Sequence, residues 1–395
     1  MISEMKNYPT RFINCVLRIL LLIILLNACS TNLESISNNA IEPGETIKIA
    51  VLTPYGAQEK KLSYIGKSLR DAAFLAKQDL GSLNFQLKIY DTEGRGDISI
   101  DSVHSAINDG ANIIVGPFLP ETTKAISTIS KSKGIRVISF SNDLTLAGNN
   151  IFIIGDTSVN RAEKLIKYSL EQKKYRFGII SPINKKYNEL ENSIRDKISR
   201  NGGIETFSIH YTKELENLSE IAKEVRKKAI NTNTDAIIFT DDPNKKISLL
   251  AAELQDITNS TEKGKIQIIG LSRWDLSSSI LSESSLQGSW VAIPDTRFRA
   301  IYEKRFFKKF GYRPHLKSSL AYDAIALVGA LIRKRDIEQS YYPFNTNEIL
   351  NSNGFIGIDG IFRFKSDRTT EKELAIATIE RNQPNILKLS PNKFP

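Results

Sequence analysis

Short runs of β-branched and aliphatic residues alternate with longer segments of helical periodicity from residue 48 onward. The run KIAVLT at 48–53 is typical of a buried strand, and residues 63–80 then place Ile65, Leu69 and Ala72 on one face of a helix. A strand followed by an amphipathic crossover helix is the repeating unit of a parallel sheet with helices on both faces. The alternation therefore predicts an α/β fold.

The alternation runs through two series, which predicts two sheets. The first series places strands at 48–53, 86–91, 112–116, 136–140 and 151–154, with helices at 63–80, 99–109 and 122–133. The second series places strands at 176–181, 206–210, 235–240 and 267–271, with helices at 158–171, 184–200, 218–231 and 244–255, and the run SWVAIP at 289–294 then leaves the series. A chain of 395 residues also exceeds the ~250–300 residues at which a single hydrophobic core stops growing. We therefore expect two doubly wound parallel-sheet lobes.

The N-terminal segment has the pattern of an export signal. Basic residues precede the apolar run ILLLIILL at 19–26, which is too short to cross the ~30 Å hydrocarbon core of a bilayer. Residues 26–29, LNAC, resemble the bacterial lipobox, which implies cleavage before Cys29 and lipidation of its thiol. We therefore predict a lipoprotein signal peptide over 1–28. An uncleaved N-terminal anchor is the alternative.

A polar stretch without periodicity follows the predicted lipidation site. Residues 29–45 are rich in Ser and Asn and end near a Pro-Gly pair, which is typical of a flexible tether. By the same lipobox resemblance, Ser30 after the Cys implies sorting to the outer membrane. We therefore expect a protein that its lipid holds at the periplasmic face of the outer membrane, with the periplasmic face of the inner membrane as the alternative.

The exported part lacks the residue patterns of metal centres and of common enzymes. The two Cys, Cys15 and Cys29, both precede the predicted strands, and the three His, His104, His210 and His315, lie far apart in the sequence. No GxSxG elbow, GxxxxGK[ST] loop or GxGxxG turn is present. We therefore expect no disulfide, no metal site, no cofactor and no enzymatic activity.

The net charge of +10 narrows the choice of partners. Residues 1–28 hold three basic residues and one acidic residue, so their removal subtracts two and leaves +8. A basic surface outside the cytoplasm suits anionic lipid headgroups, peptidoglycan carboxylates or an acidic protein face, and nucleic acid is not an expected partner. A solvated basic surface without a specific partner is the alternative.

Several short motifs are similar to those of one family of exported binding proteins. They are IAVLTP at 49–54, DTEG at 91–94, GANIIVGP at 110–117, SFSN at 139–142 and AYDA at 321–324. In this order and spacing they resemble the type I periplasmic-binding-protein fold of leucine/isoleucine/valine-binding proteins. The resemblance implies two lobes joined by three crossings, and the expected crossings lie near 143–155, 292–296 and 336–344. It assigns 46–145 and 295–336 to lobe 1, and 150–292 and 342–395 to lobe 2.

Two strand ends are similar to one branch of this superfamily. Residues 115–118, VGPF, and 140–143, FSND, resemble exported lipoproteins called penicillin-binding protein activators. This resemblance implies a non-catalytic regulator of peptidoglycan synthesis whose partner is a class A penicillin-binding protein. The alternative is the solute-binding component of an ABC importer for amino acids or related small polar ligands.

The cleft between the lobes is the expected ligand site, because open parallel sheets bind ligands at the carboxyl ends of their strands. The candidate side chains follow strand ends or begin helices: Tyr55, Thr122, Thr123, Ser141, Asn142, Asn184, Tyr187, Asp241, Asp242, Arg273 and Trp274. The resemblance puts Glu121 beside the position where amino-acid binders hold a ligand carboxylate, which counts against free amino acids. Structural roles are the alternative: Glu121 and Thr122 as helix caps, Asp241 as a cap of the next helix, and Trp274 as a core plug.

A further amphipathic helix is expected near residues 298–310. Its predicted apolar stripe consists of Phe298, Ile301, Tyr302, Phe306 and Phe310. The basic residues between them are expected to form a solvated face.

Overall fold

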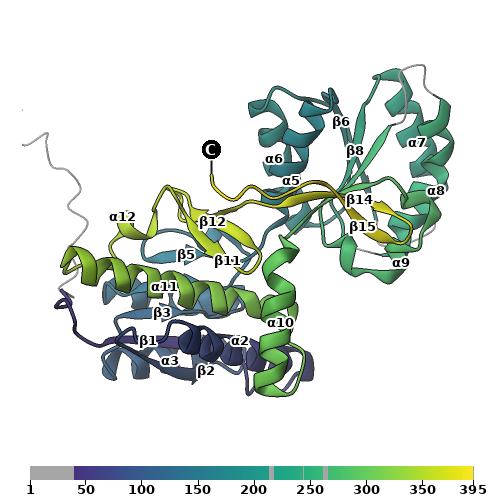
Figure 1. The fold of residues 1–395 in the computed structure, drawn as a ribbon. Helices are drawn as coiled ribbons and strands as arrows, with labels where there is room; N and C mark the ends of the chain where they lie inside the picture. Colours follow the sequence, from purple (N-terminus) through teal and green to yellow (C-terminus); the bar gives the residue numbers. More distant parts are fainter. Residues whose placement is uncertain (1–39, 213–217, 243, 261–265, 395) are drawn as a thin grey trace, which may run out of the picture. The chain divides into compact units, whose positions relative to one another are not determined.

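A parallel sheet of five strands lies at the centre of lobe 1 in the computed structural model, which describes residues 40–212, 218–242, 244–260 and 266–394 (Figure 1). The strands lie in the order β2-β1-β3-β4-β5 and pair in parallel throughout. Their bounds are β1 Ile47–Thr53, β2 Phe85–Asp91, β3 Ile113–Val115, β4 Arg136–Ser139 and β5 Ile151–Ile153. The first predicted sheet is confirmed, and Cys29 with the segment 1–39 lies outside the described residues.

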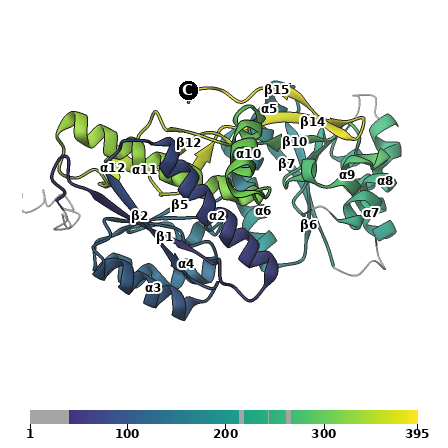
Figure 2. The same cartoon turned by 60° about the horizontal axis from the view of Figure 1, so that its bottom comes forward.

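Helices cover both faces of this sheet (Figure 2). Ile49 and Val51 of β1 share a hydrophobic cluster with α2, α10 and α11, whereas Ala50 and Leu52 pack with α3 and α4. Successive side chains of a strand point to opposite faces, so the continuous apolar run of β1 is buried on both sides. The helices of lobe 1 are α2 Lys60–Asp79, α3 Gly96–Asn108, α4 Pro120–Ser132, α10 Thr296–Phe310, α11 Ser319–Glu338 and α12 Thr346–Ile349.

A seven-stranded sheet forms lobe 2, in the order β15-β14-β10-β9-β8-β6-β7. The strands from β10 to β7 are parallel neighbours, and β14 and β15 add an antiparallel edge. Their bounds are β6 Arg176–Pro182, β7 Ile204–Tyr211, β8 Ala236–Phe239, β9 Gln267–Gly270, β10 Trp290–Ile293, β14 Ala375–Glu380 and β15 Gln383–Lys388.

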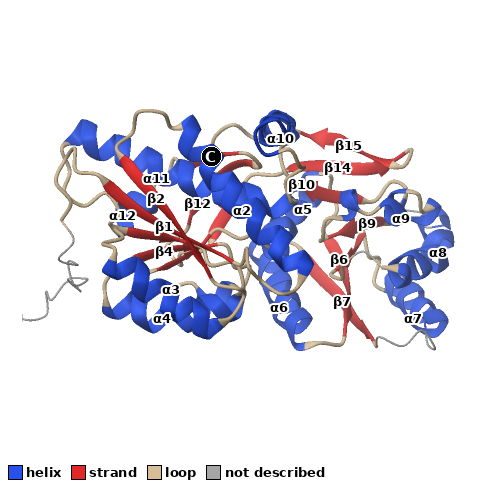
Figure 3. Cartoon of the chain, turned by 90° about the horizontal axis from the view of Figure 1, so that it is seen from below, coloured by secondary structure: helices blue, strands red, loops and turns tan. Residues whose placement is uncertain are grey.

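Lobe 2 is also covered by helices on both faces (Figure 3). Ile179 of β6 lies in one hydrophobic cluster with α5 and α6, and the next residue, Ile180, lies in another with α7 and α8. The helices of this lobe are α5 Ser158–Glu171, α6 Lys185–Arg200, α7 Leu218–Asn231, α8 Lys245–Ser260 and α9 Ser278–Leu281. None of the helices in the described ranges is long and apolar enough to span a bilayer.

The third crossing between the lobes lies later in the chain than the expected 336–344. A small antiparallel sheet, β11 (Phe355–Gly357), β12 (Gly360–Phe364) and β13 (Thr370–Lys372), follows α12. Its aromatic side chains belong to the hydrophobic cluster of lobe 1, and the ring centroids of Phe152 and Phe364 lie 5.3 Å apart. The assignment of 342–372 to lobe 2 is therefore wrong, and the chain crosses between β13 and β14.

The apolar stripe expected on α10 is only partly buried. Tyr302 and Phe306 lie in the core, whereas Phe298 and Ile301 are 46% and 59% exposed. The helix packs on α2 and α11 along a narrow face, so only side chains three to four residues apart on that face reach the core.

Candidate functional site

A cleft of about 800 Å³ lies among loops that follow the carboxyl ends of parallel strands in both lobes. Lobe 1 supplies the first residue of α4 and the loop after β4, and lobe 2 supplies part of α6 and the loops after β8 and β9. The segment between β5 and α5, the first turn of α5 and the turn before α11 complete the lining. This is the edge at which open parallel sheets bind ligands.

Three of the residues singled out in the sequence line this cleft. Asn142 follows β4, Asp242 follows β8, and Arg273 follows β9. Asn142 and Asp242 are exposed, and the Arg273 guanidinium donates to both carboxylate oxygens of Asp275, at 2.8 and 2.7 Å.

The hydroxyl groups predicted near α4 point into the protein. Thr122 and Thr123 are fully buried, and both donate from Oγ1 to the Leu119 carbonyl oxygen at 2.9 Å. Ser141 is also fully buried, and its Oγ accepts a hydrogen bond from the Asp143 N–H at 3.1 Å. These side chains hold the ends of α4 and β4 in place and are not in the cleft lining. The predicted capping role of Thr122 is wrong, because Leu119 is the N-cap residue of α4 and the Thr122 hydroxyl donates to its carbonyl oxygen.

Asp241 and Tyr187 are bound to one another beside the cleft. The Tyr187 and Tyr211 hydroxyls donate to the two Asp241 carboxylate oxygens at 2.8 and 2.6 Å. Burial, together with these bonds to Asp241, raises the pKa of both tyrosines. The three side chains thus form a structural network in lobe 2, outside the lining.

The remaining predicted residues lie away from the lining. Trp274 is fully buried and packs against Phe239 at 6.1 Å between ring centroids, so it is a core plug. A Cβ on Gly270 would come within 2.3 Å of the indole, which explains a glycine at that strand end. The Arg70 guanidinium lies over the Tyr55 ring, 5.4 Å from the ring centroid. Asn184 is exposed and precedes α6.

Charged residues that the sequence reasoning did not single out line the cleft. Asp156 and Arg161 form an ion pair at the start of α5, and their side chains are 16% and 5% exposed. Lys317 comes from the turn before α11, more than 150 residues away in the chain. A polar residue directly after Gly155, at an expected crossing, was the only sequence signal for Asp156.

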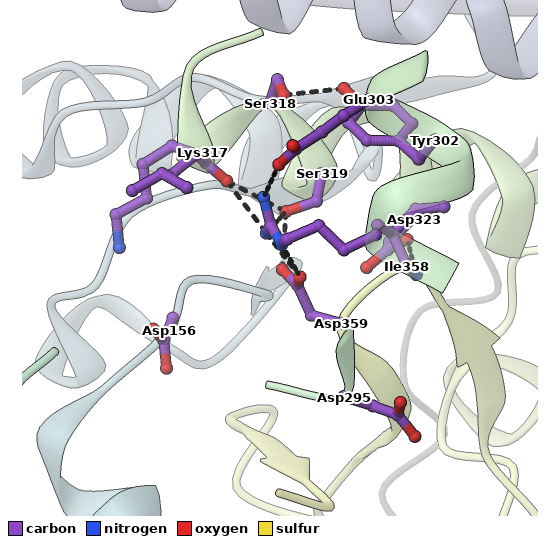
Figure 4. Close-up of polar contacts among 12 residues, drawn as sticks. Asp156, Asp295, Tyr302, Glu303, Lys317, Ser318, Ser319, Asp323, Ile358 and Asp359 are labelled. Carbon is purple, nitrogen blue, oxygen red and sulfur yellow. Dashed lines mark hydrogen bonds and ion pairs between the residues drawn. The ribbon is translucent and has the colours of Figure 1, made fainter. Parts of the chain in front are cut away.

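Lys317 and Asp156 influence each other electrostatically. Figure 4 shows the Lys317 side chain extending toward Asp156, away from the contacts around Asp359. Burial favours the neutral form of Asp156, but the charges of Arg161 and Lys317 outweigh it and hold the pKa of that carboxyl well below its usual value. Burial lowers the pKa of Lys317, while Asp156 acts in the opposite direction.

A buried polar network joins the start of α10, the start of α11 and β12 (Figure 4). The Asp359 carboxylate accepts from Arg299 Nε at 2.9 Å and from Ser319 Oγ at 2.6 Å. The neighbouring Asp323 accepts from the Ile358 N–H at 2.7 Å. Burial, followed by the charge of Asp359, raises the pKa of Asp323 to about 7.

Metal ions in proteins are held by groups of ligating side chains, most often His, Cys, Asp and Glu. Within the described ranges, no three His, Cys, Asp or Glu side chains are grouped so that they would hold a metal ion. The cleft thus offers charged and hydrogen-bonding side chains for a polar solute.

The chain matches the family model of the periplasmic binding proteins over residues 46–384. An uncharacterised protein of Rickettsia prowazekii is 21% identical over 241 residues, which are 59% of this chain and 63% of that protein. A putative branched-chain amino acid ABC transporter protein of Rhodospirillum rubrum has a TM-score of 0.73 at 13% identity, over 87% of this chain and 100% of its own.

An ABC transporter substrate-binding protein of Desulfitobacterium hafniense, solved in complex with leucine, has a TM-score of 0.61 at 17% identity, over 87% of this chain and 100% of its own. At these identities the structural likeness establishes the fold alone, and it confirms the predicted type I architecture. Because the family model matches most of the sequence, the chain belongs to the periplasmic binding protein family, with the leucine-binding-protein-like type I fold.

Proposed function

We propose that this chain is the solute-binding component of an ABC importer and that it binds a small polar solute in the cleft. The observation that carries the proposal is a space of about 800 Å³ lined by polar and charged side chains from both lobes. Clefts of roughly 300–1,000 Å³ are typical of small-molecule sites. The structural neighbours support the proposal, since they are described as ABC transporter proteins and one was solved with leucine.

The predicted role as a penicillin-binding protein activator has no support from these comparisons. The family implies a periplasmic location. An importer permease resides in the inner membrane, so we propose that the predicted lipid on Cys29 anchors the chain at the periplasmic face of that membrane rather than at the outer membrane.

Solute binding is expected to bring the lobes together. Asn142 of lobe 1 and Asp242 and Arg273 of lobe 2 all line the cleft, so one solute in it can contact residues of both lobes. A solute that gains contacts only in the closed arrangement shifts the population toward it. The closed form is then the species that a permease recognises, and no catalytic step is involved.

Thermal unfolding of the full chain in a mild detergent tests the proposal. The panel contains amino acids, carboxylic acids, short peptides, polyamines and muropeptides. A bound solute at a thousandfold excess over its Kd stabilises the folded state by about 4 kcal/mol, which raises the Tm by several degrees.

Paired variants tie that stabilisation to the cleft. Asn142→Ala is expected to reduce the Tm shift, whereas Asn353→Ala, at an exposed position outside the lining, is expected to keep it. If no solute in the panel moves the Tm while the chain is retained on immobilised class A penicillin-binding proteins, the importer proposal fails and the regulator takes its place.

A further inference from the structure

Four cationic side chains lie near Asp156, and three of them line the cleft. This basic cluster consists of Arg161, Arg273, Lys317 and Lys372, and all four act on the carboxyl of Asp156 by lowering its pKa. Arg161, Arg273 and Lys317 line the cleft, and Lys372, at the end of β13, lies behind the lining and is 5% exposed.

The two arginines of the basic cluster already have counter-ions. Arg161 is paired with Asp156, and Arg273 makes a two-point contact with Asp275. The Arg273 contact is bidentate, whereas Arg161 reaches Asp156 through Nη2 alone and its buried Nε makes no hydrogen bond among the described residues. Each of the two guanidinium charges nevertheless has a carboxylate counter-ion within the protein.

The two lysines of the basic cluster have no such partner. Among the described residues, neither the Lys317 Nζ nor the Lys372 Nζ takes part in a hydrogen bond or an ion pair, and the Lys372 ammonium lies 5.9 Å from the Phe362 ring centroid. Burial and Asp359 raise the pKa of Asp323, although Lys372 lowers it, so Asp323 is a poor counter-ion near neutral pH. A buried cation without a counter-ion is costly, and an anion placed beside it recovers that cost.

Of the four carboxylates that line the cleft, Asp156 faces Lys317 but is already paired with Arg161, and the other three do not neutralise the lysine charge. Asp143 accepts from the N–H and the hydroxyl of Thr145 in its own turn, at 3.0 and 2.7 Å. Glu189 and Asp242 are exposed and remain hydrated. The positive potential of the basic cluster therefore acts on a solute that occupies the cleft.

The N-terminus of α4 offers little to an anion. The residue of α4 in the lining is Pro120, which has no N–H, and the hydroxyls of Thr122 and Thr123 are both donated to the Leu119 carbonyl. Among the cations that line the cleft, Lys317 is the one that makes no ion pair, so it is the side chain available to an anionic group.

We propose that the solute carries net negative charge, a dicarboxylate being its simplest form, and that Lys317 holds one of its anionic groups. This inference rests on the proposed solute-binding function and names the class of the solute. Lys372 adds positive potential from behind the lining without contacting the solute.

Matched solutes test the charge on the full chain in mild detergent. Isothermal titration compares succinate with its neutral analogue succinamide, and with leucine and inorganic phosphate. We expect succinate or a related dicarboxylate to bind, succinamide not to bind, and the Kd for the dicarboxylate to rise with salt. If phosphate binds and the dicarboxylates do not, the solute is still an anion, and its anionic group is a phosphate rather than a carboxylate.

Matched variants assign the binding to Lys317. Lys317→Gln removes the charge that the solute pairs with, so we expect the Kd for the dicarboxylate to rise at least about tenfold. Lys308→Gln, at an exposed lysine of α10, is expected to leave the Kd unchanged. The Tm without solute shows whether each variant is folded, and the comparison of succinate with succinamide remains decisive if Lys317→Gln is not.

The outcomes separate this inference from the proposed function. Binding of leucine or another uncharged or zwitterionic solute, with no anion bound and the same Kd in Lys317→Gln, overturns the anionic class and leaves the importer proposal intact. Absence of binding by every solute in both panels overturns the two together.

Discussion

Asp323 is the residue at which the electrostatics of this protein depend most clearly on pH. Its carboxyl is 1% exposed, accepts a hydrogen bond from the Ile358 N–H and lies near the Asp359 carboxyl. Burial and Asp359 raise its pKa to about 7, whereas Lys372, the Ile358 N–H and Arg299 act in the opposite direction. The folded chain therefore holds a proton that the unfolded chain releases in weak acid.

We expect the free energy of unfolding to fall as the pH rises from about 4 through 7. The raised pKa of Asp323 contributes stability that is complete below the pKa of the unfolded chain and is lost as the pH passes the folded value. The loss is roughly 2–4 kcal/mol, and Asp323→Asn, which cannot ionise, should remove it. Urea unfolding at pH 5 and pH 8 measures the difference.

The matched control for this substitution is Asp101→Asn, at an exposed position on α3. It should keep the pH dependence of the natural chain. The same dependence in both variants would show that another group binds the proton.

Single side chains were predicted least well from the sequence. Hydroxyl groups near a strand end, such as those of Thr122, Thr123 and Ser141, can bind either a ligand or the backbone. In this protein they form hydrogen bonds with backbone carbonyl and N–H groups. Lys317 was missed because its place in the cleft depends on the packing of α11, which is remote in sequence from the other lining residues.

At the scale of elements, α10 shows where periodicity alone is insufficient. Its aromatic residues occur at several angles around the helix axis, and the sequence does not say which of them meets the sheet. Phe306 is fully buried against Tyr302 and Phe310, while the adjacent Phe307 is 53% exposed. Adjacent positions on a helix differ by about 100° in direction, so one faces the core and the next faces solvent.

This geometry predicts very different costs for two neighbouring substitutions. Phe306→Ala should lower the free energy of unfolding by about 3–5 kcal/mol, because it leaves a cavity in the core. Phe307→Ala should change it by less than about 0.5 kcal/mol. Guanidinium unfolding of the two variants supplies both values, and equal losses would mean that the helix is rotated from the orientation described.

At the scale of the whole molecule, the two sheets were predictable and the third crossing was not. Buried parallel strands are near-continuous apolar runs, so β1, β6 and β8 are evident in the sequence. The segment GIDGIFRF at 357–364 is compatible with a hairpin in either lobe. Its alternating pattern shows which side chains share a face of the hairpin, but not which lobe that face packs against. Its placement in lobe 1 follows from the contact of Phe364 with Phe152 and from its share in the hydrophobic cluster of that lobe, which no local pattern encodes.

Two truncated chains distinguish these arrangements. A chain that ends at Lys372 lacks β14, whose Ala377 and Ile379 are fully buried beside β10, so lobe 2 should lose its hydrogen-exchange protection while β1 and β3 keep theirs. A chain that ends at Phe344 also lacks the three-stranded sheet.

Removal of that sheet takes three aromatic side chains from the core that α11 and β1 share, so the shorter chain should lose protection in both lobes. Had the chain crossed at 336–344, the two truncations would have damaged lobe 2 alone. If the amides of β1 exchange at the same rate in the two truncated chains, the third crossing lies at 336–344, as the sequence predicted. Faster exchange in the shorter chain would mean that residues 345–372 complete lobe 1, and that the chain crosses to lobe 2 at Glu373 and Leu374.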